Sequence, residues 1–103
     1  MLMNTVDIYN IQQGIIVPIG AHASSSSLAT ALELTKPYGA RSILVQALTQ
    51  NVRYTLDGTA PTATVGFQLK AGDPPLLIPL HNSNIKFIEE TATAVLQYQW
   101  STV

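Results

Sequence analysis

Residues 51–69 alternate apolar and polar side chains on both sides of a turn signal, and this pattern restricts the fold more than any other. Apolar residues occupy every second position from Val52 to Leu56, which is the period of a half-buried β-strand. Asp57-Gly58 then marks a turn, and Pro61 delays the return to a strand. The alternation resumes from Val65 to Leu69. We therefore expect a strand, a tight turn and a second strand, with these apolar side chains in the core.

Similar short runs recur along the chain between turn residues. Further strands are expected at 6–9, 15–19, 28–34, 42–48, 76–80, 85–88 and 94–100. Segment 28–34 also fits about two turns of helix with Ser27 as N-cap, but its β-patterned neighbours favour a strand. Pro79 cannot donate a ladder hydrogen bond, so its strand should lie at a sheet edge or contain a bulge. We expect the small, polar stretch 21–27 to be an exposed loop.

Seven to nine short strands without a clear helix predict an all-β fold, an antiparallel β-sandwich or jelly roll. The whole of 1–103 is expected to form one domain, with 1–13 as an extended N-terminal arm because it lacks clean alternation. The sequence MLMNTVDIYN has no positively charged start, so no signal peptide is expected, and no apolar run approaches the ~20 residues of a membrane helix. A cytoplasmic site of synthesis follows.

The chain is poor in charge. Only 11% of its residues are charged, against ~25% in ordinary soluble domains, while 47% are apolar. Depletion of charge is expected where a surface is buried against other chains, so the composition favours a partner-bound protein over a free monomer. The net charge of −1 provides no basic field for nucleic acid.

Reactive side chains are scarce. The absence of cysteine excludes disulfides, thiolate metal sites and a cysteine nucleophile. His22 and His81 are far apart and lack the spacing of metal ligands, so both are expected in solvent. Glu89 and Glu90 should point to opposite faces of a solvated strand end, and the carboxylate of Asp57 should accept backbone N–H groups in its turn. We expect no enzyme activity, no catalytic residue, no metal and no cofactor.

Arg53 and the aromatic residues leave alternatives open. Arg53 could pair with a carboxylate of a neighbouring chain or make a local surface contact. Five aromatic residues fall on the apolar side of their strands, which predicts that they belong to the core; a sugar-binding platform would require exposed rings. These residues are Tyr54, Phe67, Phe87, Tyr98 and Trp100.

Two resemblances to known families involve the predicted hairpin at 51–69. RYTLDGTAPT resembles the YTxDGxxPT hairpin of chitobiase-type, Ig-like β-sandwich modules of carbohydrate-active enzymes. A longer pattern, QALTQNVRYTLDGTAPTATVGFQLKAGDPP followed by IKFIEETATAVLQYQW, resembles small proteins from the structural gene clusters of tailed phages. It covers about Gln46 to Trp100. The second resemblance implies a component of the virion that is made in the host cytoplasm.

The expected function is therefore a capsid decoration or cement protein that binds the major capsid protein and self-associates as a dimer or trimer. Binding of nucleic acid, membrane or a small molecule is not expected. The alternatives are another virion part, such as a connector, tail or fibre-attachment subunit, or a carbohydrate-binding module. The candidate interface is the hairpin, with Arg53, Tyr54, Asp57, Gly58, Thr59 and Pro61.

Overall fold

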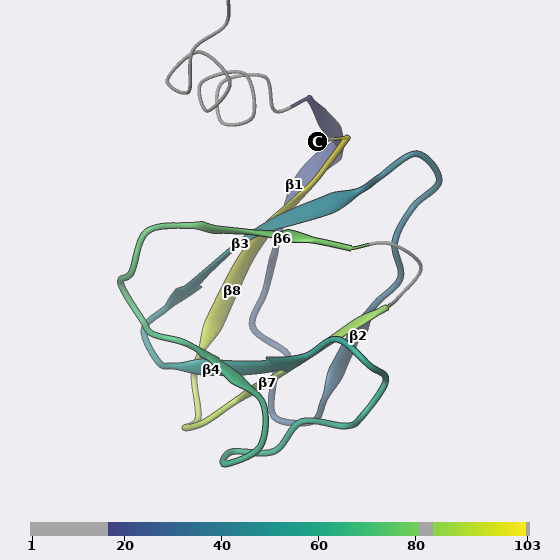
Figure 1. Ribbon diagram of the computed structural model, residues 1–103. Coiled ribbons are helices and arrows are strands. Elements are labelled where there is room, and N and C mark those ends of the chain that lie inside the picture. The colour runs from purple at the N-terminus through teal and green to yellow at the C-terminus, as the bar shows by residue number, and fades with distance from the viewer. Residues whose placement is uncertain (1–16, 81–83, 103) are drawn as a thin grey trace, which may run out of the picture.

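The computed structural model describes residues 17–80 and 84–102, and within these ranges the chain is all-β, with eight strands and no helix (Figure 1). The strands form two antiparallel sheets of four. The first sheet has the order β1-β8-β3-β6, and the second sheet has the order β2-β7-β4-β5. The strands are β1 (Pro18–Ser25), β2 (Leu32–Leu34), β3 (Ser42–Leu48), β4 (Val52–Thr55), β5 (Phe67–Leu69), β6 (Leu76–Pro79), β7 (Ile85–Glu89) and β8 (Val95–Ser101).

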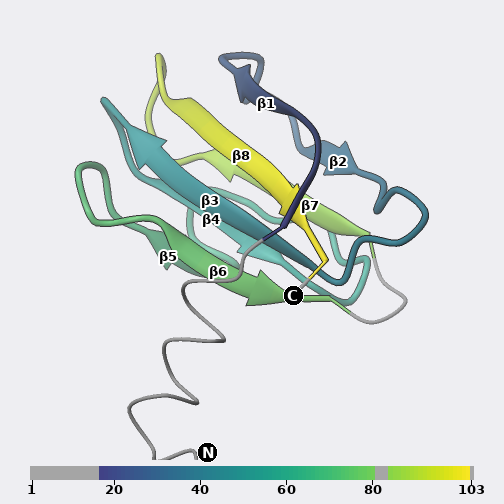
Figure 2. The ribbon, with the colours of Figure 1, turned by 90° about the horizontal axis from the view of Figure 1, so that it is seen from above.

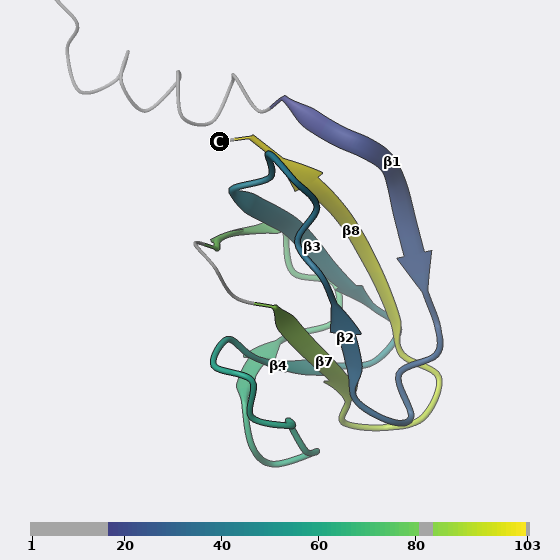
Figure 3. The same cartoon turned by 90° about the vertical axis from the view of Figure 1, so that its right-hand side faces the viewer.

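The two sheets lie as layers around one core (Figure 3), and the order of the first sheet is plain from above (Figure 2). Almost every connection between successive described strands crosses from one sheet to the other. The exception is the link from β4 to β5, which are neighbours in the second sheet. This hairpin is therefore the one place in the described fold where the chain turns back along the same layer.

Side chains from the inner faces of both sheets form the core. Ile43, Val45 and Ala47 of β3 alternate inward from the first sheet, while Phe87 of β7 is fully buried in the second sheet. Alternation places the remaining β3 side chains on the outer face. This arrangement is a β-sandwich, which confirms the predicted fold class. The core residues are Leu28, Ile43, Val45, Ala47, Val52, Tyr54, Leu69, Ile78, Leu80, Ile85, Phe87, Ala94 and Leu96.

Several local expectations are confirmed. The strand at 42–48 has the predicted bounds, and those at 85–88 and 94–100 agree within one residue. The strand that contains Pro79 lies at the edge of the first sheet, as the missing N–H requires. Segment 28–34 is not helical, but only Leu32–Leu34 is a strand. Leu28 lies outside it, buried, with its carbonyl accepting the Glu89 N–H at 3.0 Å.

The expected loop at 21–27 is wrong, because β1 continues through Ser25 and pairs with β8. Small side chains fit the edge of the first sheet beside large residues of β8: Ala23 lies opposite Tyr98. The Ser24 hydroxyl also accepts a hydrogen bond from the Gln97 side chain at 2.9 Å. The run of small polar residues does not show the pattern of a strand, because the large side chains at this pairing come from β8. A shift of register between Ile19 and Ala23 marks a bulge.

Other expectations fall outside the described residues. They are the strand at 6–9, the arm at 1–13 and the first residues of the strand at 15–19. In the part of the chain that the structure describes, no helix is long and apolar enough to cross a membrane.

Candidate functional site

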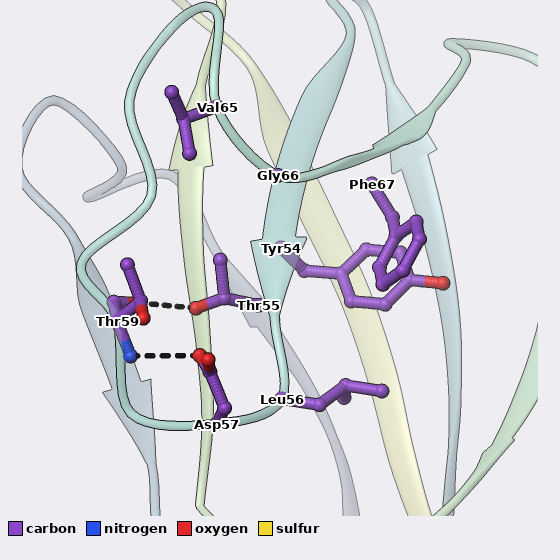
Figure 4. Close-up of a pocket in the computed structure, with 8 residues that line it drawn as sticks. All are labelled: Tyr54, Thr55, Leu56, Asp57, Thr59, Val65, Gly66 and Phe67. Carbon is purple, nitrogen blue, oxygen red and sulfur yellow. Dashed lines mark hydrogen bonds between the residues drawn. The ribbon is translucent and has the colours of Figure 1, made fainter.

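An open pocket of about 550 Å³ lies at the β4–β5 hairpin (Figure 4). Its walls come from the end of β4, the start of β5 and the loop 56–66 between them. The lining is mainly apolar, with a few hydroxyl groups and one carboxylate. The lining residues are Tyr54, Thr55, Leu56, Asp57, Thr59, Val65, Gly66 and Phe67.

Three aromatic rings lead from the core to this pocket. Phe87 is completely buried, Tyr54 is 9% exposed and Phe67 is 63% exposed. The ring centroids of Tyr54 and Phe87 are 6.1 Å apart, and those of Tyr54 and Phe67 are 5.6 Å apart, both pairs tilted by 44°. These distances are typical of favourable aromatic pairs. Burial raises the pKa of the Tyr54 hydroxyl, so this ring remains neutral.

The expectation that all apolar residues of 65–69 face the core is wrong. Leu69 is buried, but Phe67 is 63% exposed and Val65 is 50% exposed. Strand β5 is the edge of the second sheet, and Phe67 lies opposite Tyr54, whose ring stands between it and the core. The alternation correctly places Val65, Phe67 and Leu69 on the same side of the chain. Only Leu69 lies over the core, and the other two lie beyond its end. The pocket thus presents apolar groups to solvent.

The connection between β4 and β5 is a structured loop rather than the expected tight turn. Its first bend is held by Asp57, whose carboxylate accepts the Thr59 backbone N–H at 3.0 Å. This contact confirms the predicted turn role of Asp57, and the Thr59 hydrogen bonds lower the pKa of its carboxyl group. The Thr55 hydroxyl donates to the Thr59 carbonyl, and the Thr62 hydroxyl accepts the Val65 N–H at 3.0 Å. The loop is therefore ordered by its own side chains.

Gly66 closes the loop against β4. Its φ of +128° lies in a region that favours glycine, and a Cβ placed there would lie 2.9 Å from the Tyr54 carbonyl oxygen. The Gly66 carbonyl also accepts a hydrogen bond from Arg53 Nη1 at 2.9 Å. Any side chain at this position would push the loop off β4 and change the wall of the pocket.

Behind the pocket, on the outer face of the second sheet, Arg53 pairs with Glu90. The Nε–Oε2 distance is 2.7 Å, and the two side chains are 24% and 17% exposed. Gln68 Nε2 also donates to Glu90 Oε2 at 2.7 Å, and Asn51 donates to the other carboxylate oxygen at 3.4 Å. Donation from Gln68 is the main cause that lowers the pKa of Glu90, followed by Asn51 and Arg53.

The expected solvated strand end at Glu89 and Glu90 is wrong. Glu90 is mostly covered and bonded, and Glu89 Oε1 accepts the Ala94 N–H at 3.3 Å. The Glu90 backbone N–H also donates to the carbonyl of Asn51, in the connection between β3 and β4, at 3.0 Å. For Arg53, the local contact is the one that the structure contains. A contact with another chain stays a prediction.

Two observations bear on acid–base and metal chemistry. The described residues contain no cluster of three or more histidine and carboxylate groups that could hold a metal ion. A general acid at neutral pH needs a raised carboxyl pKa, whereas the pKa values of Asp57 and Glu90 are lowered. His22 is exposed as expected, but its Nε2 lies 2.5 Å from the Gln97 side-chain oxygen. His81 lies outside the described residues.

The structure brings part of the predicted interface together. Tyr54, Asp57 and Thr59 line the pocket, while Arg53 lies on the opposite face of β4. Gly58 is exposed at the tip, where its carbonyl accepts a hydrogen bond from Lys86 Nζ at 3.0 Å. Pro61, by contrast, is buried and cannot be a contact surface as it stands.

Sequence reasoning missed the two side chains that most mark the site, Val65 and Phe67. Alternation tells which side of a strand a residue occupies, but it does not tell where the opposing layer ends.

Comparison of the chain with models of protein families, with curated proteins and with solved structures found no match.

Proposed function

We propose that this chain is a structural protein of a tailed-bacteriophage virion, and specifically a capsid decoration or cement protein that binds the head shell. The sequence resemblance between Gln46 and Trp100 suggests the class of particle. One observation of the fold carries the proposal further: an apolar pocket stands open beside Phe67 and Val65, which are 63% and 50% exposed. Exposed apolar groups around a hollow are typical of sites that bind another protein.

The site fits a docking role because its shape is held before a partner arrives. The loop bonds of Asp57 and Thr62 order one wall, and Tyr54 supports Phe67 from below. A preformed pocket avoids much of the entropy cost of ordering a loop on binding. A protruding apolar side chain of the shell protein would fill the pocket and continue the row of rings from Phe87.

The proposal is tested by adding purified protein to phage heads that lack it and measuring bound copies per major capsid protein. Bound amounts comparable with the number of capsid subunits support a decoration protein; a single ring at one vertex would instead indicate a connector or tail subunit. Phe67→Ala should weaken binding by about tenfold or more, as loss of an aromatic anchor does.

Tyr38→Ala is the matched control, since Tyr38 is a fully exposed aromatic residue on a different part of the surface. It should leave binding to heads unchanged. Equal effects of the two substitutions, or no binding of the unaltered protein to any head, would contradict the assignment of the pocket as the docking site.

The exposed ring of Phe67 also favours a second candidate, a carbohydrate-binding module, because sugars stack on exposed aromatic rings. Phe67 and Tyr38 do not form one platform, since they line different pockets. A glycan array decides between the two: saturable binding that is lost in Phe67→Ala, with no binding to heads, would establish the carbohydrate-binding function.

A further inference from the structure

The first sheet carries no charged side chain. None of the residues in β1, β8, β3 and β6 is Asp, Glu, Lys or Arg. On the outer face of its two central strands, apolar and amide side chains alternate with the core residues and lie directly opposite one another. This outer face consists of Leu44, Gln46, Leu48, Val95, Gln97 and Gln99.

The amide groups on this face already have partners within the chain. Gln97 Nε2 donates to Ser24 at 2.9 Å, while its oxygen lies beside the His22 ring. The Nε2 atoms of Gln99 and Gln46 donate to backbone carbonyls at 3.1 Å. Burial of a polar group is costly chiefly when its hydrogen bonds are lost. A partner could therefore cover this face without leaving these amide donors unsatisfied.

We propose that the outer face of the first sheet packs against the same face of a second copy of this chain. A two-fold interface places the same surface of both subunits together. A charged face would then set like charges against each other, but an uncharged face has no such repulsion. The second sheet, with Glu33, Arg53, Lys86 and Glu89 in its strands, lacks this property.

The size of the face sets the expected strength. The four strands have 8, 7, 7 and 4 residues, and at about 3.3 Å per residue and about 4.8 Å per strand they give a face of about 400 Å². Two copies would thus bury about 800 Å² in total, at the upper end of crystal contacts and below the ~1,200–2,000 Å² of stable complexes. The dimer should be weak in solution and stronger when many copies are held on one surface. In that last respect the inference rests on the proposed function.

Sedimentation velocity of the full chain over a range of concentrations measures this association. The unaltered protein should show a dimer that dissociates on dilution. Gln97 lies on an inner strand, opposite Gln46, near the centre of the face. Gln97→Glu and Gln97→Lys, each alone, should raise the dimer dissociation constant by about tenfold or more, because like charges meet across the two-fold axis.

Mixing the Glu and Lys variants should restore the dimer, since opposite charges then face each other. Thr30→Glu adds the same charge at an exposed position outside the strands and should associate like the unaltered protein. Thermal unfolding shows whether each variant folds; if one does not, the same pair of changes at Gln46 replaces it.

A protein that stays monomeric up to about 1 mM would overturn the proposal. So would Gln97 variants that dimerise normally, or folded variants that the mixture fails to rescue. These outcomes are separate from those of the head-binding test. A monomer that still binds heads overturns this inference alone, and a dimer that binds no head overturns the proposed function alone.

Discussion

The two sheets share one core but differ in what they present to solvent. The first sheet has uncharged strands, with apolar and amide side chains on the outer face of its central strands, whereas the second sheet carries four charged residues in its strands. On the second sheet, charged side chains bind within the chain. Arg53 of β4 contacts Glu90, which follows β7, and the carbonyl of Gly66 in the β4–β5 loop. On the first sheet, β1 and β3 are held by backbone pairing and side-chain packing against β8. The scarcity of charged residues is thus greatest in the strands of the first sheet.

The difference corresponds to the two contacts proposed above. The second sheet ends in a pocket with a defined shape, which suits recognition of a protruding side chain. The first sheet offers a broad, neutral face, which suits contact with a similar face. Under the proposed function, the pocket would contact the shell protein and the neutral face would contact a neighbouring copy. The following predictions test whether the two layers are as distinct as this comparison states.

The largest effect is expected where the layers meet. Phe87 is fully buried in the second sheet and packs in the common core. Phe87→Ala should lower the free energy of unfolding by about 3–5 kcal/mol, through lost burial and the cavity left behind. Because the core is shared, urea unfolding followed by Trp100 fluorescence, on the first sheet, and by circular dichroism should shift together. Separate transitions would mean that the two layers unfold independently.

An intermediate effect is expected at the hairpin. Gly66→Ala should destabilise the fold by about 2–3 kcal/mol, because its Cβ would meet the Tyr54 carbonyl in a backbone region that side chains avoid. Gly58→Ala is the matched control: its φ is +89°, but nothing lies within 4 Å of the added atom. It should cost about 1 kcal/mol from backbone strain alone. Equal losses in the two variants would show that the close approach to β4 is unimportant.

The smallest effect concerns charge on the second sheet. The folded-state pKa of Glu90 is lowered from its ordinary 4.5, so its carboxylate stabilises the fold above that pH and this contribution is lost as the pH falls through the folded value. Glu90→Gln should reduce stability at pH 7 by less than about 1 kcal/mol, and the difference from the unaltered protein should vanish in acid.

Chemical denaturation between pH 7 and pH 3 measures this convergence. Asp57→Asn is the comparison variant: the pKa of Asp57 is also lowered, so it contributes with the same sign, but it lies at the loop tip outside the Arg53 network. A Glu90→Gln difference that persisted or grew toward pH 3 would show that the ion pair contributes nothing through its charge.

Sequence patterns predicted the strands that lie between two other strands and have one face in the core. Residues 42–48 have the expected bounds because this strand is buried between β8 and β6. Pro79 predicted an edge because its chemistry forbids a ladder bond wherever it lies. In contrast, the part of β1 after residue 19 was missed, since its small residues form a strand only where Tyr98 and Gln97 pack against them. The Arg53–Glu90 pair joins residues far apart in the sequence, and no local signal brings them together.

By itself, the amino-acid sequence determined that this protein is all-β, that Asp57 makes a turn and that charge is scarce. These properties follow from backbone preferences and side-chain chemistry that act over a few residues. Only the tertiary structure decided that Phe67 is exposed while Tyr54 is buried, and that the charged residues of the described strands all lie in one sheet. The physical reason is that exposure depends on which strand lies opposite and where that layer ends, and strand alternation contains no information about either.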